Sequence, residues 1–483
     1  MEVNVKLKMQ SLRRWKLSKI ICGGLVASLA SIPISTYAKP NRGAGKVATD
    51  PNDKCEFFDR GEGKTLANNV TSNVNHFWCR MKSDARVQTD IESLLSFEGI
   101  VMGDPHFRNF SDYQNGGESG IHLYDSDDAG HAPLILDFVR YMVFVEAYER
   151  SEEQIPNGSI KFGDVFQSYR DGLAAGAKLQ TQPSAEEIRQ AALGDSKVKD
   201  KKLIEYMTDL GQKDEASTLV EHFCWAGPGP ECNQENVKAL DTEGHFLAKF
   251  SEKEQLNPKG TISVENLKKP KPGEKETLDL ALKKADEIFK LLDNPSVLQT
   301  ALDGYTLGAA DSWKVADQAW SVKASGSSRG QVRIWLALKS RHGDYSVVEF
   351  KQMGDPGVAQ YQPIQPDLES RLQEAREAYA DVTLGTESKI VSIGDAQFWR
   401  RPRHFFNYDF DLLAEKTAKK PNNAAVDLVF FLAHWMGLHQ GLQENGKALA
   451  AAFNSKSEDQ IEAVVRNYLA EIQIGSGSRN MKD

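Results

Sequence analysis

The sequence has 483 residues and a formal net charge of −9 at pH 7. This length exceeds one ordinary domain of ~100–200 residues, so we expect more than one folded unit. An acidic chain whose aromatic residues lack an interleaved basic stripe is a poor nucleic-acid binder, so we expect no nucleic-acid partner.

Residues 1–38 have the pattern of a secretory signal peptide. Basic residues precede an apolar run over 20–34, and the small residues Thr36 and Ala38 suit cleavage after Ala38. The run is shorter than the ~18–20 residues of a spanning helix and contains Pro33, which favours cleavage over a membrane anchor. Removal of six basic and one acidic residue would take the formal charge from −9 to −14. We therefore expect an exported protein, periplasmic or secreted, with no stable membrane anchor.

Four cysteines remain beyond residue 38, namely Cys55, Cys79, Cys224 and Cys232. An even number suits disulfide bonds in an oxidising compartment. Proximity in sequence favours Cys55 with Cys79 and Cys224 with Cys232, although the sequence alone leaves the other pairings open. A zinc site is the alternative, but the chain has no C-x-x-C pair, so disulfides are the better prediction.

Two short polar segments carry the clearest chemical signal, G-D-P-H-F-R-N-F at 103–110 and Y-D-S-D-D-A-G at 124–130. Phosphoryl transfer needs a positioned base for the attacking hydroxyl and oxygen ligands that hold Mg²⁺ against the phosphates. Asp104 could orient the hydroxyl, while Asn109 and Asp125 could supply metal ligands. The two segments together therefore favour chemistry on phosphate groups.

The surroundings of these segments predict strands. Residues 111–120 are polar and glycine-rich, so 97–102 and 121–124 are predicted to be neighbouring strands joined by a loop. Both functional segments would then emerge from the ends of these strands, on one edge of the predicted sheet. Asp, Asn and Gly are also common turn formers, so either segment alone is a weak signal.

In this order and spacing the segments resemble the catalytic and metal-binding loops of the protein-kinase-like phosphotransferases. The likeness is to the aminoglycoside and choline kinase branch, with its H-G-D-x-H-x-x-N and I-D-x-x-x-A-G patterns. His106 matches the internal histidine of the first pattern, while Met102 stands where its first histidine would be. That superfamily also has a helix with a buried aspartate shortly after the metal loop. The resemblance implies that Asp137, in P-L-I-L-D-F-V-R, braces the catalytic loop rather than reacts.

The region from 151 to 302 looks helical and charged. Apolar positions recur at helical spacing in four segments, at 162–175, 185–193, 201–210 and 276–292. Such stripes are more often plain core than part of a cofactor site. The charge runs at 197–202 and 268–276 are predicted to be solvated faces or linkers.

A small-residue turn over 322–330 is followed by two predicted strands, at 332–338 and 345–351, and then by a helix-like stretch over 366–381. In a kinase small lobe, glycine-loop amides cover the phosphates, and a strand lysine grips them while it pairs with a helix glutamate. The second predicted strand ends in Lys351.

This comparison gives the expected nucleotide-binding residues, which are Gly326, Ser327, Gly330, Lys351 and Glu374. Glu369 and Glu377 are alternative partners for Lys351. Taken separately these features are weak, because a lone glycine-rich turn is usually only a hairpin turn.

The joint order of the motifs resembles the bacterial domain of unknown function 2252 family. In that family a G-D-x-H-x-x-N-F loop and a D-x-D-x-A loop come first, and a G-x-G-S-x-G turn and a V-K-E strand lie far downstream. The likeness runs from about residue 97 to about residue 442, and its D-x-D-x-A loop implies Asp127 as a metal ligand beside Asp125. The sequence departs from the pattern at Ser111, Ser126 and Gln352.

The resemblance implies an α+β, protein-kinase-like, two-lobed fold, and the motif order indicates circular permutation with a helical insertion. The expected parts are a signal peptide (1–38), an N-terminal segment (39–96), the catalytic-loop and metal-loop part of the large lobe (97–150), a helical region of the large lobe (151–318), a nucleotide-clamping small lobe (319–402) and C-terminal helices that complete the large lobe (403–483). A helix at 426–442 would take the place of the kinase helix that leads into the catalytic loop.

We therefore expect a secreted kinase-like phosphotransferase that uses Mg²⁺ and ATP, or another nucleotide, to modify a hydroxyl acceptor. The periplasm and the exterior are not normally supplied with ATP, so a catalytically silent kinase-like binding protein is the second hypothesis. A metal-dependent phosphoesterase, suggested by G-D-P-H at 103–106, ranks last because its companion G-N-H motif is absent.

Overall fold

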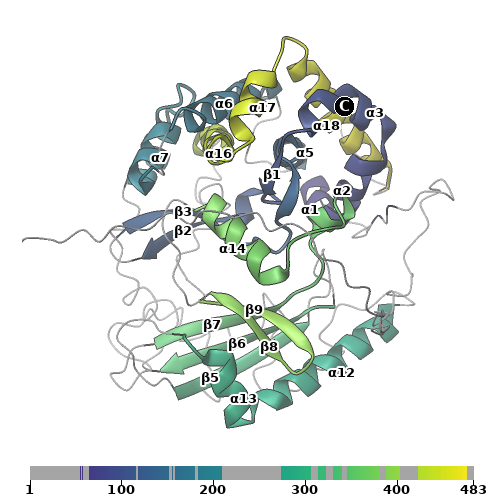
Figure 1. Ribbon diagram of the computed structural model, residues 1–483, viewed down its shortest axis with the longest axis vertical. Coiled ribbons are helices and arrows are strands. Elements are labelled where there is room, and N and C mark those ends of the chain that lie inside the picture. The colour runs from purple at the N-terminus through teal and green to yellow at the C-terminus, as the bar shows by residue number, and fades with distance from the viewer. Residues whose placement is uncertain are drawn as a thin grey trace, which may run out of the picture. The chain divides into compact units, whose positions relative to one another are not determined.

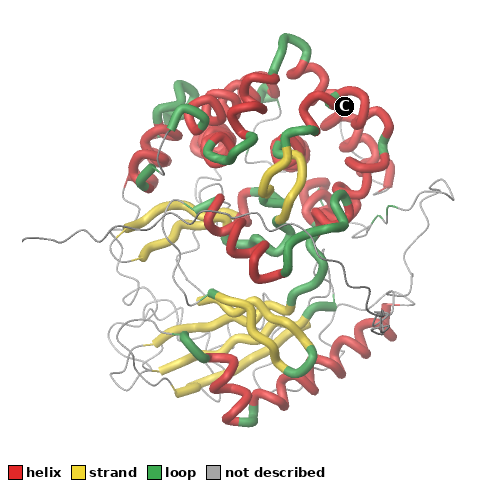
Figure 2. Tube along the Cα trace, in the orientation of Figure 1, coloured by secondary structure: helices red, strands yellow, loops and turns green. Residues whose placement is uncertain are grey.

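The computed structural model describes residues 55, 57, 65–115, 118–151, 155, 158–179, 183–208, 274–305, 314–322, 330–339, 345–380, 388–402 and 423–475. The chain divides into residues 1–40, which lie outside the described residues, and residues 41–483, to which every element below belongs. The described part combines helices with small antiparallel sheets (Figures 1 and 2), so the α+β class is confirmed. The predicted signal peptide and the predicted Cys224–Cys232 pair lie outside the described residues.

Short helices precede the first strand. They are α1 (Leu66–Thr71), α2 (Val74–Ser83), α3 (Ala85–Asp90) and α4 (Glu92–Leu95). Thr65 and Asp84 accept hydrogen bonds from backbone amides in the first turns of α1 and α3, which stabilises these helix ends. A disulfide joins Cys55 to Cys79 on α2, so this predicted pairing is confirmed.

Two nested antiparallel pairs of strands surround the predicted catalytic segment. The strands are β1 (Glu98–Val101), β2 (Phe110–Asn115), β3 (Glu118–Leu123) and β4 (Gly130–Pro133). β1 pairs with β4, and β2 pairs with β3. The prediction of 97–102 and 121–124 as neighbouring strands joined by a loop is therefore wrong, because β2 and the start of β3 lie between them and β1 pairs with β4 instead. This nesting places the segment between β1 and β2 beside the segment between β3 and β4.

Longer helices form the main apolar core. They are α5 (Ile135–Ser151), α6 (Phe162–Gly176), α7 (Ala185–Leu193), α8 (Lys201–Thr208), α16 (Asn423–Gly441), α17 (Gly446–Ala452) and α18 (Ser457–Gly475). The helices predicted at 162–175, 185–193, 201–210 and 426–442 are confirmed to within a few residues. α16 is apolar on nearly all sides and is buried along almost its whole length, as expected for a central core helix.

Glycines allow α6 and α16 to approach each other backbone to backbone. A Cβ atom on Gly172 would lie 2.0 Å from the carbonyl oxygen of His434, and one on Gly437 would lie 2.2 Å from that of Tyr169. Both distances are far below any real contact, so a side chain at either position would force the helices apart. The packing of this core therefore requires glycine at both positions.

The second half of the structure is built on a five-stranded antiparallel sheet with the order β5-β6-β7-β9-β8 (Figure 1). Its strands are β5 (Lys314–Val322), β6 (Val332–Lys339), β7 (Tyr345–Gln352), β8 (Lys389–Ile393) and β9 (Ala396–Pro402). The strands predicted at 332–338 and 345–351 are confirmed as β6 and β7. Between β7 and β8 the chain forms the short helix η3 (Gly357–Gln360) and the helix α14 (Leu368–Ala378).

The two faces of this sheet differ in chemistry. Alternate residues such as Ile334, Phe350 and Phe398 form an apolar cluster with α12 (Glu274–Leu292) and α13 (Pro295–Leu302). Since these helices pack on the sheet, they do not belong to the large lobe as predicted for the region 151–318.

No helix within the described ranges is long and apolar enough to cross a membrane.

The glycine packing gives a test of stability. We expect Gly172→Ala to lower the free energy of unfolding by about 3 kcal/mol or more, because its Cβ meets rigid backbone. The matched control is Gly163→Ala on the same helix, whose Cβ would meet only the mobile carboxylate end of Glu458. The control should change stability by no more than ~1 kcal/mol, in either direction. Urea denaturation of both variants measures this, and equal effects would contradict the backbone contact.

Candidate active site

The loop that follows β1 is held by the helix α5. Both carboxylate oxygens of Asp137, in the first turn of α5, accept backbone N–H bonds, from Met102 at 2.6 Å and from Gly103 at 3.0 Å. The Trp78 indole Nε1 donates to the carbonyl of Gly103 at 2.8 Å. The sequence resemblance implied a bracing role for Asp137, and these contacts are of that kind.

The same loop lies directly against the acidic segment. Gly103 has φ +82°, and a Cβ there would lie 2.0 Å from the backbone oxygen of Asp128. Only glycine therefore fits, by conformation and by space. One carboxylate oxygen of Asp128 accepts the backbone N–H of Gly357 at 2.8 Å, which links the acidic segment to η3.

Asp104 is a buried carboxylate with partners on both oxygens. Arg140 of α5 donates from Nε (3.0 Å) and Nη2 (2.7 Å) to Oδ1, and His106 Nε2 lies 3.2 Å from Oδ2. Burial disfavours the charged form, but the charges of Arg140 and His106 outweigh it, so the pKa of Asp104 lies below its ordinary value. Asp104 is therefore an ionised, oriented hydrogen-bond acceptor at neutral pH.

Asn109 connects the two polar segments. Its side-chain Nδ2 donates to the Asp104 carbonyl at 2.8 Å, and its backbone carbonyl accepts the N–H of Tyr124 at 2.7 Å. The first contact uses the amide nitrogen, which leaves the amide oxygen as the atom of this side chain that can bind a cation.

The strongest charged contact joins the acidic segment to the sheet. The Lys351 ammonium on β7 lies 2.5 Å from Asp125 Oδ1 and 2.8 Å from Asp127 Oδ2, and the lysine side chain is only 2% exposed. Burial opposes ionisation of Asp125, but Lys351 and Arg401 outweigh it and hold its pKa well below the ordinary value. Burial and the adjacent Asp125 charge raise the pKa of Asp127.

A second layer of charge lies behind this pair, and sequence reasoning did not identify it. Arg401 on β9 donates from Nε to Glu349 at 2.9 Å and from Nη1 to the Tyr124 carbonyl at 2.7 Å. Its Nη1 also lies 3.5 Å from Asp125. The guanidinium lies over two aromatic rings, with centroids 4.0 Å away for Tyr124 and 4.5 Å away for Trp399. Arg401 and Lys351 thus lie against the same carboxylate oxygen of Asp125, Oδ1.

Strand register explains why these groups meet. Lys351 and Glu349 are two residues apart on β7 and so share one face of the sheet. Arg333 on β6 pairs in register with Lys351, and Arg401 on β9 pairs with Glu349. Arg333 Nη1 lies 3.4 Å from Glu349. Charged residues at alternate positions of β7, with arginines on β6 and β9, are the signal in the sequence that could have identified the layer.

The glutamate predicted to pair with Lys351 does not do so. Glu374 on α14 instead contacts His131 Nε2 at 2.6 Å, and both side chains are 44% exposed. α14 approaches the acidic segment through Arg371, which donates to the backbone carbonyls of Asp127 (2.8 Å) and Ala129. The assignment of Glu374 to the nucleotide site is therefore wrong, since the helix holds the acidic segment and Asp125 and Asp127 hold the lysine.

The predicted glycine turn is only partly described. Gly330 has φ +81° and open space around its Cα, which is compatible with a tight turn into β6. Gly326 and Ser327 lie outside the described residues.

The predicted metal ligands fit a hard cation in their chemistry. Asp125, Asp127 and the amide oxygen of Asn109 are oxygen donors of the type that Mg²⁺ prefers, and an ammonium group already lies between the two carboxylates. Within the described ranges, no group of three or more His, Cys, Asp or Glu side chains is arranged to hold a metal. A metal here would therefore depend on two carboxylates, the amide and ligand atoms from a bound phosphate or water.

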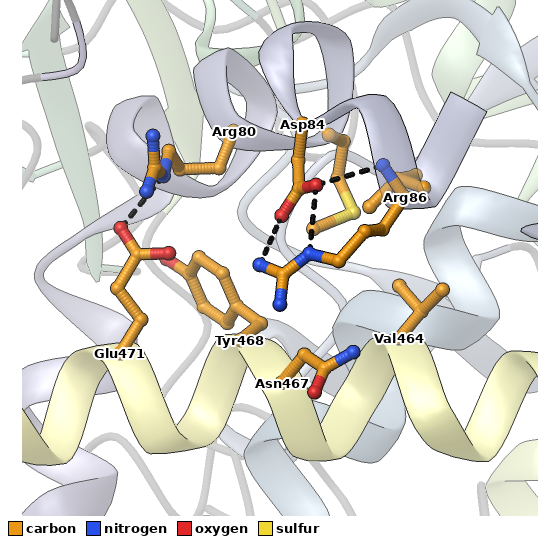
Figure 3. Close-up of a pocket in the computed structure, with 9 residues that line it drawn as sticks. Arg80, Asp84, Arg86, Val464, Asn467, Tyr468 and Glu471 are labelled. Carbon is orange, nitrogen blue, oxygen red and sulfur yellow. Dashed lines mark hydrogen bonds and ion pairs between the residues drawn. The ribbon is translucent and has the colours of Figure 1, made fainter. Parts of the chain in front are cut away.

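A separate hollow lies between α2, α3 and α18 (Figure 3). Its charged side chains are paired with one another, Arg80 with Glu471 at 2.6 Å and Arg86 with Asp84 at 2.7 Å. None of the predicted site residues lines it, so it offers no alternative place for the predicted chemistry.

Comparison with protein-family models, with curated proteins and with solved structures found no match to this chain.

The brace at Asp137 predicts a dependence of stability on pH. Burial raises the pKa of Asp137 to about 7, although the N–H groups of Met102, Gly103 and Gln440 lower it. The folded state therefore holds this proton more tightly than the unfolded chain, whose pKa is ~3.9. The contribution of this proton to the free energy of unfolding is fully present below pH ~4 and is lost as the pH rises through ~7. Between these pH values this contribution falls by about 1.4 kcal/mol per pH unit.

We therefore expect the unfolding free energy of the wild type minus that of Asp137→Asn to fall between pH ~4.5 and ~8. Urea denaturation across this range measures the difference. Asp395→Asn, at a side chain that is 86% exposed, is the control and should show no such trend. A difference that rises with pH would show that the N–H donors keep Asp137 ionised.

Proposed function

We propose that this chain is an exported phosphotransferase with a permuted protein-kinase-like architecture, which uses a Mg²⁺–nucleotide complex to modify a hydroxyl acceptor on a small molecule or a protein. The observation that carries the proposal is the contact of Lys351 with Asp125 and Asp127. Lys351 and Asp125 are 226 residues apart in sequence, yet they form one buried charged centre. A phosphate-gripping lysine beside a metal-holding aspartate is the core of a kinase site.

The arrangement of the sheet supports the same conclusion. In protein kinases the lysine stands on the third strand of the small-lobe sheet and a helix follows that strand. Here Lys351 stands on β7, the third strand of its sheet in chain order, and the short helix η3 and then α14 follow it. Chain order supports the proposed permutation, because the catalytic and acidic segments precede the sheet and α16 follows it.

Each residue has a role that its geometry allows. Asp104, ionised and fixed by Arg140 and His106, would accept the hydrogen bond of the incoming hydroxyl. Lys351 would grip the phosphates, while Asn109, Asp125 and Asp127 would hold the metal. Bound Mg²⁺ would neutralise charge on the phosphate oxygens.

A catalytically silent binding protein is the second candidate. Both oxygens of Asp104 already have partners, and Glu374 is bound to His131 instead of Lys351. Both observations are compatible with a cleft that binds a metal–nucleotide complex without transferring a phosphate. Turnover, measured separately from binding, distinguishes the two candidates.

We expect the purified protein to show a rise in melting temperature with millimolar Mg²⁺ and ATP, because a ligand that binds only the folded state stabilises it. Asp125→Asn should weaken binding of the metal–nucleotide complex roughly 10- to 100-fold. Asp104→Asn should leave binding intact and lower phosphate transfer by roughly 10²- to 10⁴-fold. Transfer from γ-labelled ATP to water or to the protein itself is a readout that needs no knowledge of the acceptor.

The outcomes separate the candidates. No melting shift for the wild type at millimolar nucleotide would overturn both. Binding that depends on Asp125, with no transfer above the level of Asp104→Asn, would favour the silent binding protein. Equal loss of binding in both variants would contradict the roles given to these two side chains.

A further inference from the structure

Lys351 occupies the position that a metal ion would need. Its ammonium contacts Asp125 and Asp127 together, at 2.5 and 2.8 Å, and its side chain is 2% exposed. The lysine therefore acts as the resident cation of the carboxylate pair. A divalent ion that binds both carboxylates has to displace it.

The surrounding charges leave the displaced lysine without a partner. The described cluster contains Asp125, Asp127, Asp128 and Glu349 on the acidic side and Lys351, Arg401, Arg333 and Arg371 on the basic side, so its formal charges balance. Glu349 is fully buried and already contacts the guanidinium groups of Arg333 and Arg401. A divalent ion alone would give this cluster an excess of positive charge and leave an ammonium group buried beside two guanidinium groups.

We propose that this site takes its ligand only as a metal–phosphate pair, and that Lys351 couples the two halves of that ligand. The proposal rests on the proposed function and specifies the form in which the donor binds. The metal binds the two carboxylates in place of Lys351. The phosphate chain then supplies the negative charge that pairs with the released ammonium. Either half alone leaves a buried charge uncompensated, which is strongly unfavourable.

The same geometry predicts opposite effects of a single substitution. Without the ammonium, Asp125 and Asp127 lose their resident cation and become a better site for a bare divalent ion. The phosphate chain at the same time loses its positive partner. Loss of Lys351 should thus strengthen binding of free metal and weaken binding of the metal–nucleotide complex.

Mn²⁺ serves as the probe, because its free form is counted directly by electron paramagnetic resonance. For the wild type we expect bare Mn²⁺ to bind roughly 100-fold more weakly than the Mn²⁺–ATP complex. In Lys351→Met, bare Mn²⁺ should bind at least tenfold more tightly than in the wild type, and Mn²⁺–ATP at least tenfold more weakly. Lys389→Met is the matched control, since Lys389 is on β8, is 35% exposed and lies 3.8 Å from Asp303; it should change neither affinity.

Unchanged or weaker binding of bare Mn²⁺ in Lys351→Met would overturn the coupling. So would equal affinities of the wild type for bare Mn²⁺ and for Mn²⁺–ATP, a comparison that needs no variant and holds even if Lys351→Met does not fold. Failure of the proposed function looks different, because the wild type would then bind no Mn²⁺–ATP at millimolar concentration.

Discussion

The buried contact of Lys351 with Asp125 and Asp127 is the interaction on which the rest of the site depends. Removing charged groups from water is costly, and the cost is recovered only when each charge has a close partner. Arg401 and Glu349 extend the pairing behind Asp125. The five-stranded sheet and the nested hairpins are thus joined by buried ion pairs. Removal of any one charge would leave its partner buried without compensation.

Rigid backbone surrounds this charged centre. Gly103 lies against the backbone of Asp128, and Asp137 holds the amides on either side of the bend. Arg371 holds the acidic segment from the other side through its backbone carbonyls. The acidic segment is therefore held through its backbone as well as through its carboxylates, whose oxygens contact Lys351 and Arg401.

The sequence predicted the elements better than their partners. Apolar spacing located α6, α7 and α8, because a helix is defined by contacts along one stretch of chain. It failed for β1, whose partner β4 comes after another complete hairpin, and for Glu374, because the choice of partner for Lys351 is made by tertiary packing. Arg401 was missed, since alternation places a side chain on a face but does not say what that face meets. The roles of Asp104, Asn109 and Asp125 stay predictions.

The glycine contact between α6 and α16 has a consequence for how the chain reaches its native state. Tyr169 on α6 bonds Gln440 on α16 across 271 residues of sequence, and the whole five-stranded sheet lies between the two helices in the chain. Contacts this distant in sequence form slowly, because long loops have to close before the contacts stabilise anything. During synthesis α16 therefore emerges only after α6 and the whole sheet, and α6 has no partner for its glycine face until it does.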